Sequence, residues 1–179
     1  MQPQSILHFW FTELTPMDHF AKDAALDEAI RSRFGATLEA AAQCELFAWR
    51  ATPEGRLAEV LVLDQFSRNV YRDTARAFAQ DALALALAQE LVASGHDRSL
   101  PLAQRSFVYM PYMHSESALV HAQAALLFAQ PGLEDTLRFE LRHKEIIDHF
   151  GRYPHRNALL GRESTTEELA FLSEPGSGF

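Results

Sequence analysis

Apolar residues recur at helical spacing along most of this chain of 179 residues, with polar residues between them. Leu26, Ile30 and Phe34 follow one another at steps of four, and His143 shares a face with Ile147. This periodicity predicts amphipathic helices. With their caps, the predicted helices cover residues 5–14, 23–34, 37–49, 52–69, 76–94, 101–110, 115–128, 133–150 and 164–172.

Capping residues and helix breakers set the predicted ends. Thr52 is followed by a proline and an acid, which is typical of a helix start. Gly35 is expected to bend or end the second helix, and Pro111 to end the helix before it. Asn69 and Gly95 are expected to end helices, Asn69 in left-handed geometry. The other expected capping residues are Ser5, Thr37, Ser115 and Ser164, the last in a capping box with Glu167.

One segment shows the alternation of a strand. Residues 82–88 read ALALALA, but alanine and leucine are strong helix formers and β-branched residues are scarce there. We therefore expect a helix. In the later helix over 133–150, acids precede bases by four residues, which predicts three stabilising pairs. These pairs are Glu134/Arg138, Glu140/Lys144 and Asp148/Arg152.

The expected fold class is all-α, in a single domain over residues 1–179, because no linker or low-complexity tract divides the chain. Helix pairs joined by short turns fit either an irregular helical bundle or a tetratricopeptide-like solenoid. No repeat of about 34 residues is visible, so self-similarity does not favour the solenoid.

Composition predicts a soluble cytoplasmic protein. Hydrophobic residues make up 47% of the chain, and 13 phenylalanines can fill a sizeable core. The single cysteine, Cys44, fits a reducing compartment. The first ten residues do not resemble a signal peptide, and no apolar run reaches the roughly 18 residues that span a bilayer.

The charge distribution argues against some partners. A formal net charge of −8 disfavours non-specific binding to nucleic acid or to anionic lipid. Residues 138–162 reverse the sign locally, with six basic and three acidic side chains. This reversal points to an anion, such as a small anionic molecule or an acidic peptide, as the candidate partner.

Three segments mix charged, amide and aromatic residues more densely than a helical core requires. In the first, Asp64 and Arg68 can pair along a helix, or Arg68 and Gln65 can bind a polar ligand together with Asn69. The second, residues 107–116, contains Tyr109, His114 and Glu116. Within one helix His114 and Glu116 would point apart, but in a loop they could converge on a ligand or substrate.

The third segment, residues 150–157, places Arg152, His155, Arg156 and Asn157 around a proline-containing turn. Arginine forks bind carboxylate or phosphate, so an anion pocket is one interpretation. The other is that these arginines pair with acids and hold the C-terminal helix in place. His143 is expected to be a satisfied buried histidine unless it meets His114 and His155, which would make an acid–base or metal site credible. No metal-binding, nucleotide-binding or redox motif is present, and no cofactor can be assigned.

These same segments resemble a known family. The stretches are ILHFWF (6–11), LDQFSRNVYR (63–72), FVYMPYMHSE (107–116), FGRYPHRN (150–157), LGRESTTEELAFL (160–172) and SGF (177–179). They are similar to an uncharacterised bacterial family, domain of unknown function 924, over nearly the whole chain. The resemblance implies a tetratricopeptide-like, right-handed superhelix of antiparallel helix pairs. It implies no reaction, cofactor or catalytic residue.

Two functions from different classes fit these features. In the first, a concave polar pocket binds a small anionic ligand or acidic peptide through Arg68, Arg152 and Arg156. In the second, the chain is an enzyme in which His114 or His155 acts as general acid–base, Glu116 orients it, and the arginines position a carboxylate or phosphate. The sequence does not decide whether the chain is an enzyme. Surface aromatics are compatible with a homodimer.

Overall fold

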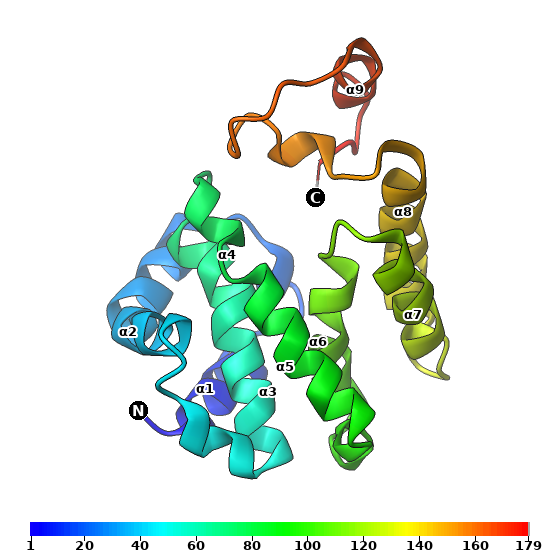
Figure 1. Ribbon diagram of the computed structural model, residues 1–179. Coiled ribbons are helices and arrows are strands. Elements are labelled where there is room, and N and C mark those ends of the chain that lie inside the picture. The colour runs from blue at the N-terminus through cyan, green and yellow to red at the C-terminus, as the bar shows by residue number, and fades with distance from the viewer. Residues whose placement is uncertain (179) are drawn as a thin grey trace. The chain divides into compact units, whose positions relative to one another are not determined.

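The computed structural model describes residues 1–178, and in that range the chain is helical without a strand (Figure 1). The predicted all-α class is confirmed. Of the tail segment 174–179, Phe179 lies outside the described residues. The α-helices are α1 (Pro3–His8), α2 (Ala24–Ala42), α3 (Pro53–Leu61), α4 (Ser67–Val70), α5 (Asp81–Ala93), α6 (Leu102–Met113), α7 (Ala118–Phe128), α8 (Glu134–Phe150) and α9 (Thr166–Leu172).

The chain divides into two compact units. The N-terminal unit comprises Met1–Arg72 and Arg76–Pro111, and the C-terminal unit comprises Asp73–Ala75 and Tyr112–Phe179. The division falls within α6, so the helix contributes residues to both units. The single domain over 1–179 and the superhelix of helix pairs both stay predictions.

An aromatic core holds the N-terminal unit together, where α1 and α5 both pack against α3 and α2 packs against α4. The Phe66 ring lies 6.0 Å from Phe9, 5.6 Å from Trp10 and 5.2 Å from Phe34. Phe107 meets Trp10 edge-on at 5.7 Å. These five side chains are almost fully buried, and such ring pairs add to the free energy of burial.

Helix α2 contradicts the predicted break at Gly35. A single helix continues through Gly35 and Thr37, and Asp23 caps its start by accepting from the Ala25 N–H at 2.8 Å. Ile30, Phe34, Leu38 and Ala41 are buried, so the apolar period runs on past the glycine. Their burial outweighs the cost of about 1 kcal/mol for glycine in a helix. The first helix also begins earlier than predicted, because Pro3 rather than Ser5 opens it.

The start of α3 confirms the prediction at Thr52, whose Oγ1 accepts from the Gly55 N–H at 3.1 Å. The helical path then passes through a π-helical segment, Val62–Phe66, into α4. Asn69 lies inside α4 and does not adopt left-handed geometry, so its predicted role as a cap is wrong. Its side-chain amide instead donates to Asp27 of α2.

The alternating segment 82–88 forms part of α5, as predicted, and Gly95 follows in left-handed geometry with φ of +72°. Helix α5 begins at Asp81 instead of residue 76, since residues 75–78 form a separate 3-10 turn. Pro111 lies inside α6 and does not end it. The buried neighbours Met110, Tyr112 and Met113 offset the cost of a proline within the helix.

In the C-terminal unit α7 packs along α8, and Ile146, Ile147 and Tyr153 form a small core with Phe150 and Phe171. Helix α7 starts at Ala118, with Ser117 rather than Ser115 at its cap position. The capping box of α9 is present, but one residue later than predicted, at Thr165 and Glu168. Gly151 ends α8 in left-handed geometry, with φ of +70°.

The three predicted charge pairs along α8 are wrong, because their members bind other groups. The nearer partner is a backbone N–H for Glu134, a side chain of α7 for Glu140 and a lysine four residues earlier in α8 for Asp148. Glu134 accepts from the Gly132 N–H, Arg138 pairs with Asp135, Glu140 binds His121, Lys144 binds Asp148, and Arg152 binds Glu168.

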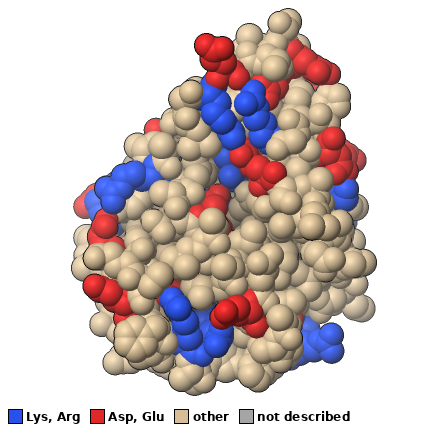
Figure 2. Space-filling view, viewed as in Figure 1, with Lys and Arg blue, Asp and Glu red and all other residues tan. Residues whose placement is uncertain are grey.

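In several patches of the surface that Figure 2 shows, acidic and basic side chains lie next to one another, and most of the rest of this view belongs to other residues. Ion pairs between side chains include Arg33 with Glu13 and Arg68 with Asp81. Among residues 1–178, no helix is both long enough and apolar enough to cross a bilayer.

Candidate functional site

The structure divides the predicted site residues between the two units. Asp64, Gln65, Arg68, Asn69 and Tyr109 belong to the N-terminal unit. His114, Glu116, His143, Arg152, His155, Arg156 and Asn157 belong to the C-terminal unit.

In the N-terminal unit the first segment forms an ion-pair network. Asp64 and Gln65 lie in the π-helical segment, a local geometry that is frequent at functional sites. Arg68 is 3.2 Å from the carboxylate of Asp64, as the spacing predicts, and also donates to both oxygens of Asp81 at 3.0 and 3.1 Å. Gln65 donates to Asp64. These contacts give Arg68 a structural role that joins α5 to the end of the preceding helix.

Two further networks engage the other N-terminal candidates. Arg72 binds Asp27 through two hydrogen bonds of 2.5 and 2.7 Å, and Asn69 donates to the same carboxylate at 2.8 Å. Tyr109, fully buried, donates to Asp97 at 2.6 Å. Burial raises the pKa of Asp27, but the hydrogen bonds from Arg72 and Asn69 outweigh it and lower the pKa overall.

In the C-terminal unit Arg152 holds α9 in place. It donates to both carboxylate oxygens of Glu168 at 2.6 and 2.8 Å and to the Glu163 carbonyl at 2.9 Å. Glu168 is also the acid of the α9 capping box, and it accepts from the Thr165 N–H. The contacts of Arg152 thus match the interpretation in which an arginine of this turn pairs with an acid and secures the C-terminal helix.

This pair predicts a loss of stability in acid. The hydrogen bonds from Arg152, and then that of the Thr165 N–H, lower the pKa of Glu168 from 4.5 to about 2. A carboxyl with a lowered pKa in the folded state stabilises the protein above its unfolded pKa and loses this effect as the pH falls. We expect the urea midpoint to fall between about pH 5 and about pH 2, and to fall less in Glu168→Gln. Glu167→Gln, whose carboxylate is exposed, is the control and should keep the wild-type pH dependence.

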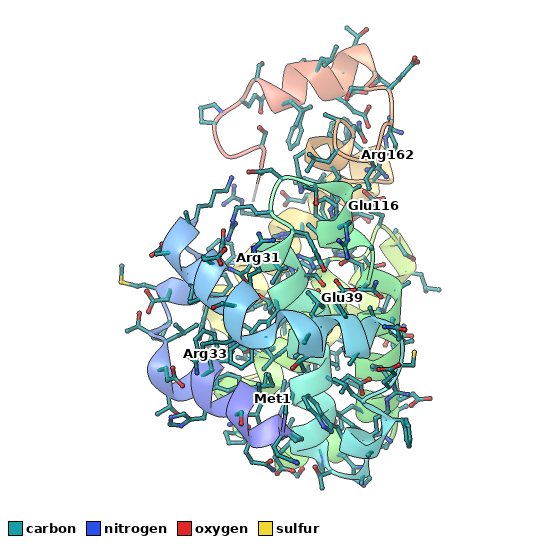
Figure 3. The ribbon with its side chains drawn as sticks, turned by 90° about the vertical axis from the view of Figure 1, so that its left-hand side faces the viewer. Met1, Arg31, Arg33, Glu39, Glu116 and Arg162 are labelled. Carbon is teal, nitrogen blue, oxygen red and sulfur yellow. The ribbon has the colours of Figure 1, made fainter. Side chains whose placement is uncertain are left out.

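Glu116 holds the turn that contains Tyr153. It lies in the loop between α6 and α7, accepts from Arg162 at 2.6 and 2.9 Å and accepts from the Tyr153 N–H at 2.8 Å. Figure 3 shows the labelled side chains of Glu116 and Arg162 together. Partial burial raises the pKa of Glu116, but the hydrogen bonds of Arg162 and Tyr153 outweigh it and lower the pKa. Neither carboxylate oxygen bonds a histidine among the described residues, so Glu116 positions the turn rather than an imidazole.

Nitrogen-bearing side chains surround Tyr153, whose ring is fully buried. The Arg156 guanidinium lies 4.5 Å from the ring centroid, and the rings of His155, His143 and His121 lie 5.5, 5.7 and 6.2 Å away. The charge of His114 contributes to lowering the pKa of His143, so the two side chains are near one another. We call these six residues the Tyr153 cluster: Tyr153, His114, His121, His143, His155 and Arg156. It brings together His114, His143, His155 and Arg156 from the sequence prediction.

His143 is neutral at physiological pH. Burial lowers its pKa to about 3, with further lowering by His114, His121 and His155. Its Nδ1 lies 2.7 Å from the Phe139 carbonyl oxygen, which can only accept, so Nδ1 carries the proton and Nε2 keeps its lone pair. His143 is thus the buried, hydrogen-bonded histidine that the sequence predicts.

A buried histidine–glutamate pair lies beside these residues. His121 Nδ1 is 2.8 Å from Glu140 Oε1, and both side chains are fully buried. His121 Nε2 lies 2.8 Å from the Ser115 carbonyl oxygen and 3.1 Å from the Tyr153 hydroxyl, which itself donates to Met113. The carbonyl contact requires a proton on Nε2, and the contact with Glu140 requires another. The pair therefore holds one proton between imidazole and carboxyl and has no net charge.

Sequence reasoning missed His121, Glu140, Arg162 and the central role of Tyr153. The hydrogen bond from His121 joins α7 to α8 across 19 positions, and that from Arg162 reaches Glu116 across 46. The position of Glu140 could have indicated a buried partner, because it lies on the same face of α8 as the buried residues. Burying a carboxylate without a partner is costly. We assigned Glu140 to Lys144 at the regular i,i+4 spacing instead.

Asn157, the last candidate, is buried and donates to Ser164 at 3.0 Å, so it helps to fix the loop before α9. In residues 1–178 no three histidine, cysteine, aspartate or glutamate side chains are arranged to hold a metal ion.

Comparisons with known proteins give two findings. The sequence model of a family described as bacterial protein of unknown function (DUF924) matches residues 6–176. The chain is similar to a protein of unknown function from Agrobacterium tumefaciens whose structure is solved, with 38% sequence identity. The match covers 96% of this chain and 96% of that chain, and the two structures superpose with a TM-score of 0.91. No curated protein matches the sequence.

Proposed function

We propose a function for this chain, which belongs to the DUF924 family of bacterial proteins of unknown function. In this proposal, the Tyr153 cluster binds a small anion of the carboxylate or phosphate class. One observation carries the proposal. Four groups that bear or can accept positive charge lie within 6.2 Å of the centre of one buried ring. An anion close to such groups favours their charged forms, and Arg156 is charged at any ordinary pH.

Two acids near the cluster have partners of their own, and the charge of one of them, Glu116, also acts on Arg156. Glu140 shares a proton with His121, and Glu116 is hydrogen-bonded to Arg162 and to the backbone of Tyr153. Arg156 supplies a permanent charge and a planar fork that matches carboxylate or phosphate. Burial is the largest cause of the lowered pKa of His143, and the charges of His114, His121 and His155 lower it further. A bound anion would act against these charges and favour the protonated imidazoles.

The anion proposal predicts a specific loss of affinity in Arg156→Gln. We expect inorganic phosphate or succinate to bind the wild-type chain in isothermal titration calorimetry, and the variant to bind about 10 to 100 times more weakly, because a charge-assisted contact contributes about 1.5–3 kcal/mol. Circular dichroism should show the wild-type helix content.

The matched control is Arg138→Gln, also in the C-terminal unit but exposed and paired with Asp135. It removes the same charge and should leave the affinity unchanged. Absence of binding by both probes to the wild-type chain, or equal weakening by the two substitutions, would contradict the proposal.

A second candidate is acid–base catalysis on the bound anion, favoured by the hydrogen-bonded histidine–carboxylate pair at the edge of the cluster. His114 or His155 would then transfer the proton, and Arg156 would position the substrate. NMR spectra of a bound phosphate ester or dicarboxylate distinguish the candidates. They stay unchanged with time for a binding protein and develop product signals for an enzyme.

A cytoplasmic location belongs to the same proposal. It is supported by the single cysteine, which is exposed and not in a disulfide. The proposed partners are small anions or acidic peptide termini, rather than nucleic acid or membrane.

A further inference from the structure

Helix α7 is apolar on the side that packs in the unit and also on the side that faces solvent. It contains no Asp, Glu, Lys or Arg. His121, Ala124 and Phe128 are buried, whereas Leu119 and Leu126 are 76% and 70% exposed. A helix that is hydrophobic all round is normally covered on all sides. The exposed residues, which we call the α7 face, are Ala118, Leu119, Ala122, Gln123 and Leu126.

The order of residues on the α7 face is symmetric. Leu119 and Leu126 lie equally far from the midpoint between Ala122 and Gln123. If two such helices cross antiparallel about a two-fold axis at this midpoint, each Leu119 meets the partner's Leu126 and each Ala122 meets the partner's Gln123. The small Ala122 allows the helices to approach closely, and the two Gln123 amides lie near the axis, where they can hydrogen-bond. A surface that is complementary to itself is what a two-fold interface requires.

We propose that the α7 face is the interface through which two copies of this chain form a two-fold symmetric dimer. Charge favours a second copy here more than at the charged patches of the surface. Each copy carries a formal net charge of −8, so two copies repel one another unless they meet where the surface is neutral. The part of the surface that α7 contributes is uncharged, in contrast to the patches of mixed charge that Figure 2 shows. Dimerisation would also remove the two largely exposed leucines of each chain from water.

The first test is sedimentation equilibrium of the full chain with Leu126→Glu. We expect the wild-type chain to be dimeric at about 100 μM, and the variant to be monomeric with a dissociation constant raised at least about 100-fold, since each interface loses two leucines and gains two charges. Phe47→Glu is the matched control, because Phe47 is also 70% exposed but lies in the N-terminal unit, and it should leave the dimer intact. A monomeric wild-type chain, or a dimer unchanged by Leu126→Glu, overturns the proposal.

Cross-linking tests the geometry without relying on a destabilising substitution. In a Cys44→Ser background, Ala122→Cys should give a covalent dimer with a short bis-maleimide, because the two copies of residue 122 lie close to the axis. Asp135→Cys, at a side chain that is 82% exposed on α8, is the control and should stay monomeric on a denaturing gel. Equal cross-linking at both positions would indicate random collision and would refute the interface.

Discussion

Gly55→Ala is expected to destabilise the N-terminal unit by about 3 kcal/mol or more, one of the two largest effects of any single substitution proposed for this chain. A Cβ at this position would lie 2.0 Å from the backbone oxygen of Trp49, and a backbone atom cannot move aside as a side chain can. The segment around Trp49 would have to move away from α3. That movement pulls Arg50 from Glu59, a fully buried carboxylate that Arg50 binds at 2.7 Å through two hydrogen bonds. Urea unfolding followed by circular dichroism measures the loss.

Gly35→Ala is the matched control in the same unit. Gly35 lies inside α2, and a Cβ there meets nothing within 4 Å. Alanine should therefore stabilise the protein by about 0.5–1 kcal/mol, because it reduces the backbone freedom of the unfolded chain. A similar change in unfolding free energy for both substitutions would show that the contact at Trp49 is not the cause.

Local chemistry predicted most of the helices but few of their ends. Thr52 caps α3 and Gly151 ends α8, because the groups that decide these ends are adjacent in sequence. Gly35 and Pro111 misled the prediction, since both are breakers by intrinsic preference. Burial of their neighbours against other elements outweighs that preference, and the sequence does not show which neighbours are buried.

The candidate site was predictable in residue type but not in pairing. The loop between α6 and α7 supplied His114, and the turn at 150–157 supplied His155 and Arg156. The structure places all three with His143 in one unit. The sequence offered two roles for the arginines, an anion pocket or a structural pair. Arg152 makes the structural pair with Glu168, whereas Arg156 stacks on Tyr153. Contacts with residues elsewhere in the chain determine which role each arginine has. The periodicity of the sequence does not predict such contacts.

His121→Leu is expected to lower the free energy of unfolding by about 3–5 kcal/mol, because it removes one partner of a fully buried pair. Burial raises the pKa of Glu140, against the effect of His121, so without the imidazole this carboxyl must be buried uncompensated or take up a proton. Its Oε2 already has no hydrogen-bond partner among the described residues, so the loss of the bond at Oε1 leaves the group with none. Urea unfolding at neutral pH measures the effect, and Glu140→Leu should cost a similar amount.

The double variant His121→Leu/Glu140→Leu distinguishes a coupled pair from two independent core residues. Two apolar side chains leave no buried charge behind, so the double variant should be more stable than the sum of the single losses predicts, by about 2–3 kcal/mol. The chain contains a matched control in His149 and Glu167, which are also 2.8 Å apart and in the same unit but are largely exposed. His149→Leu should cost less than about 1 kcal/mol and show little coupling to Glu167→Leu. Strict additivity at His121 and Glu140 would mean that the two side chains are not energetically coupled and would contradict the buried pair.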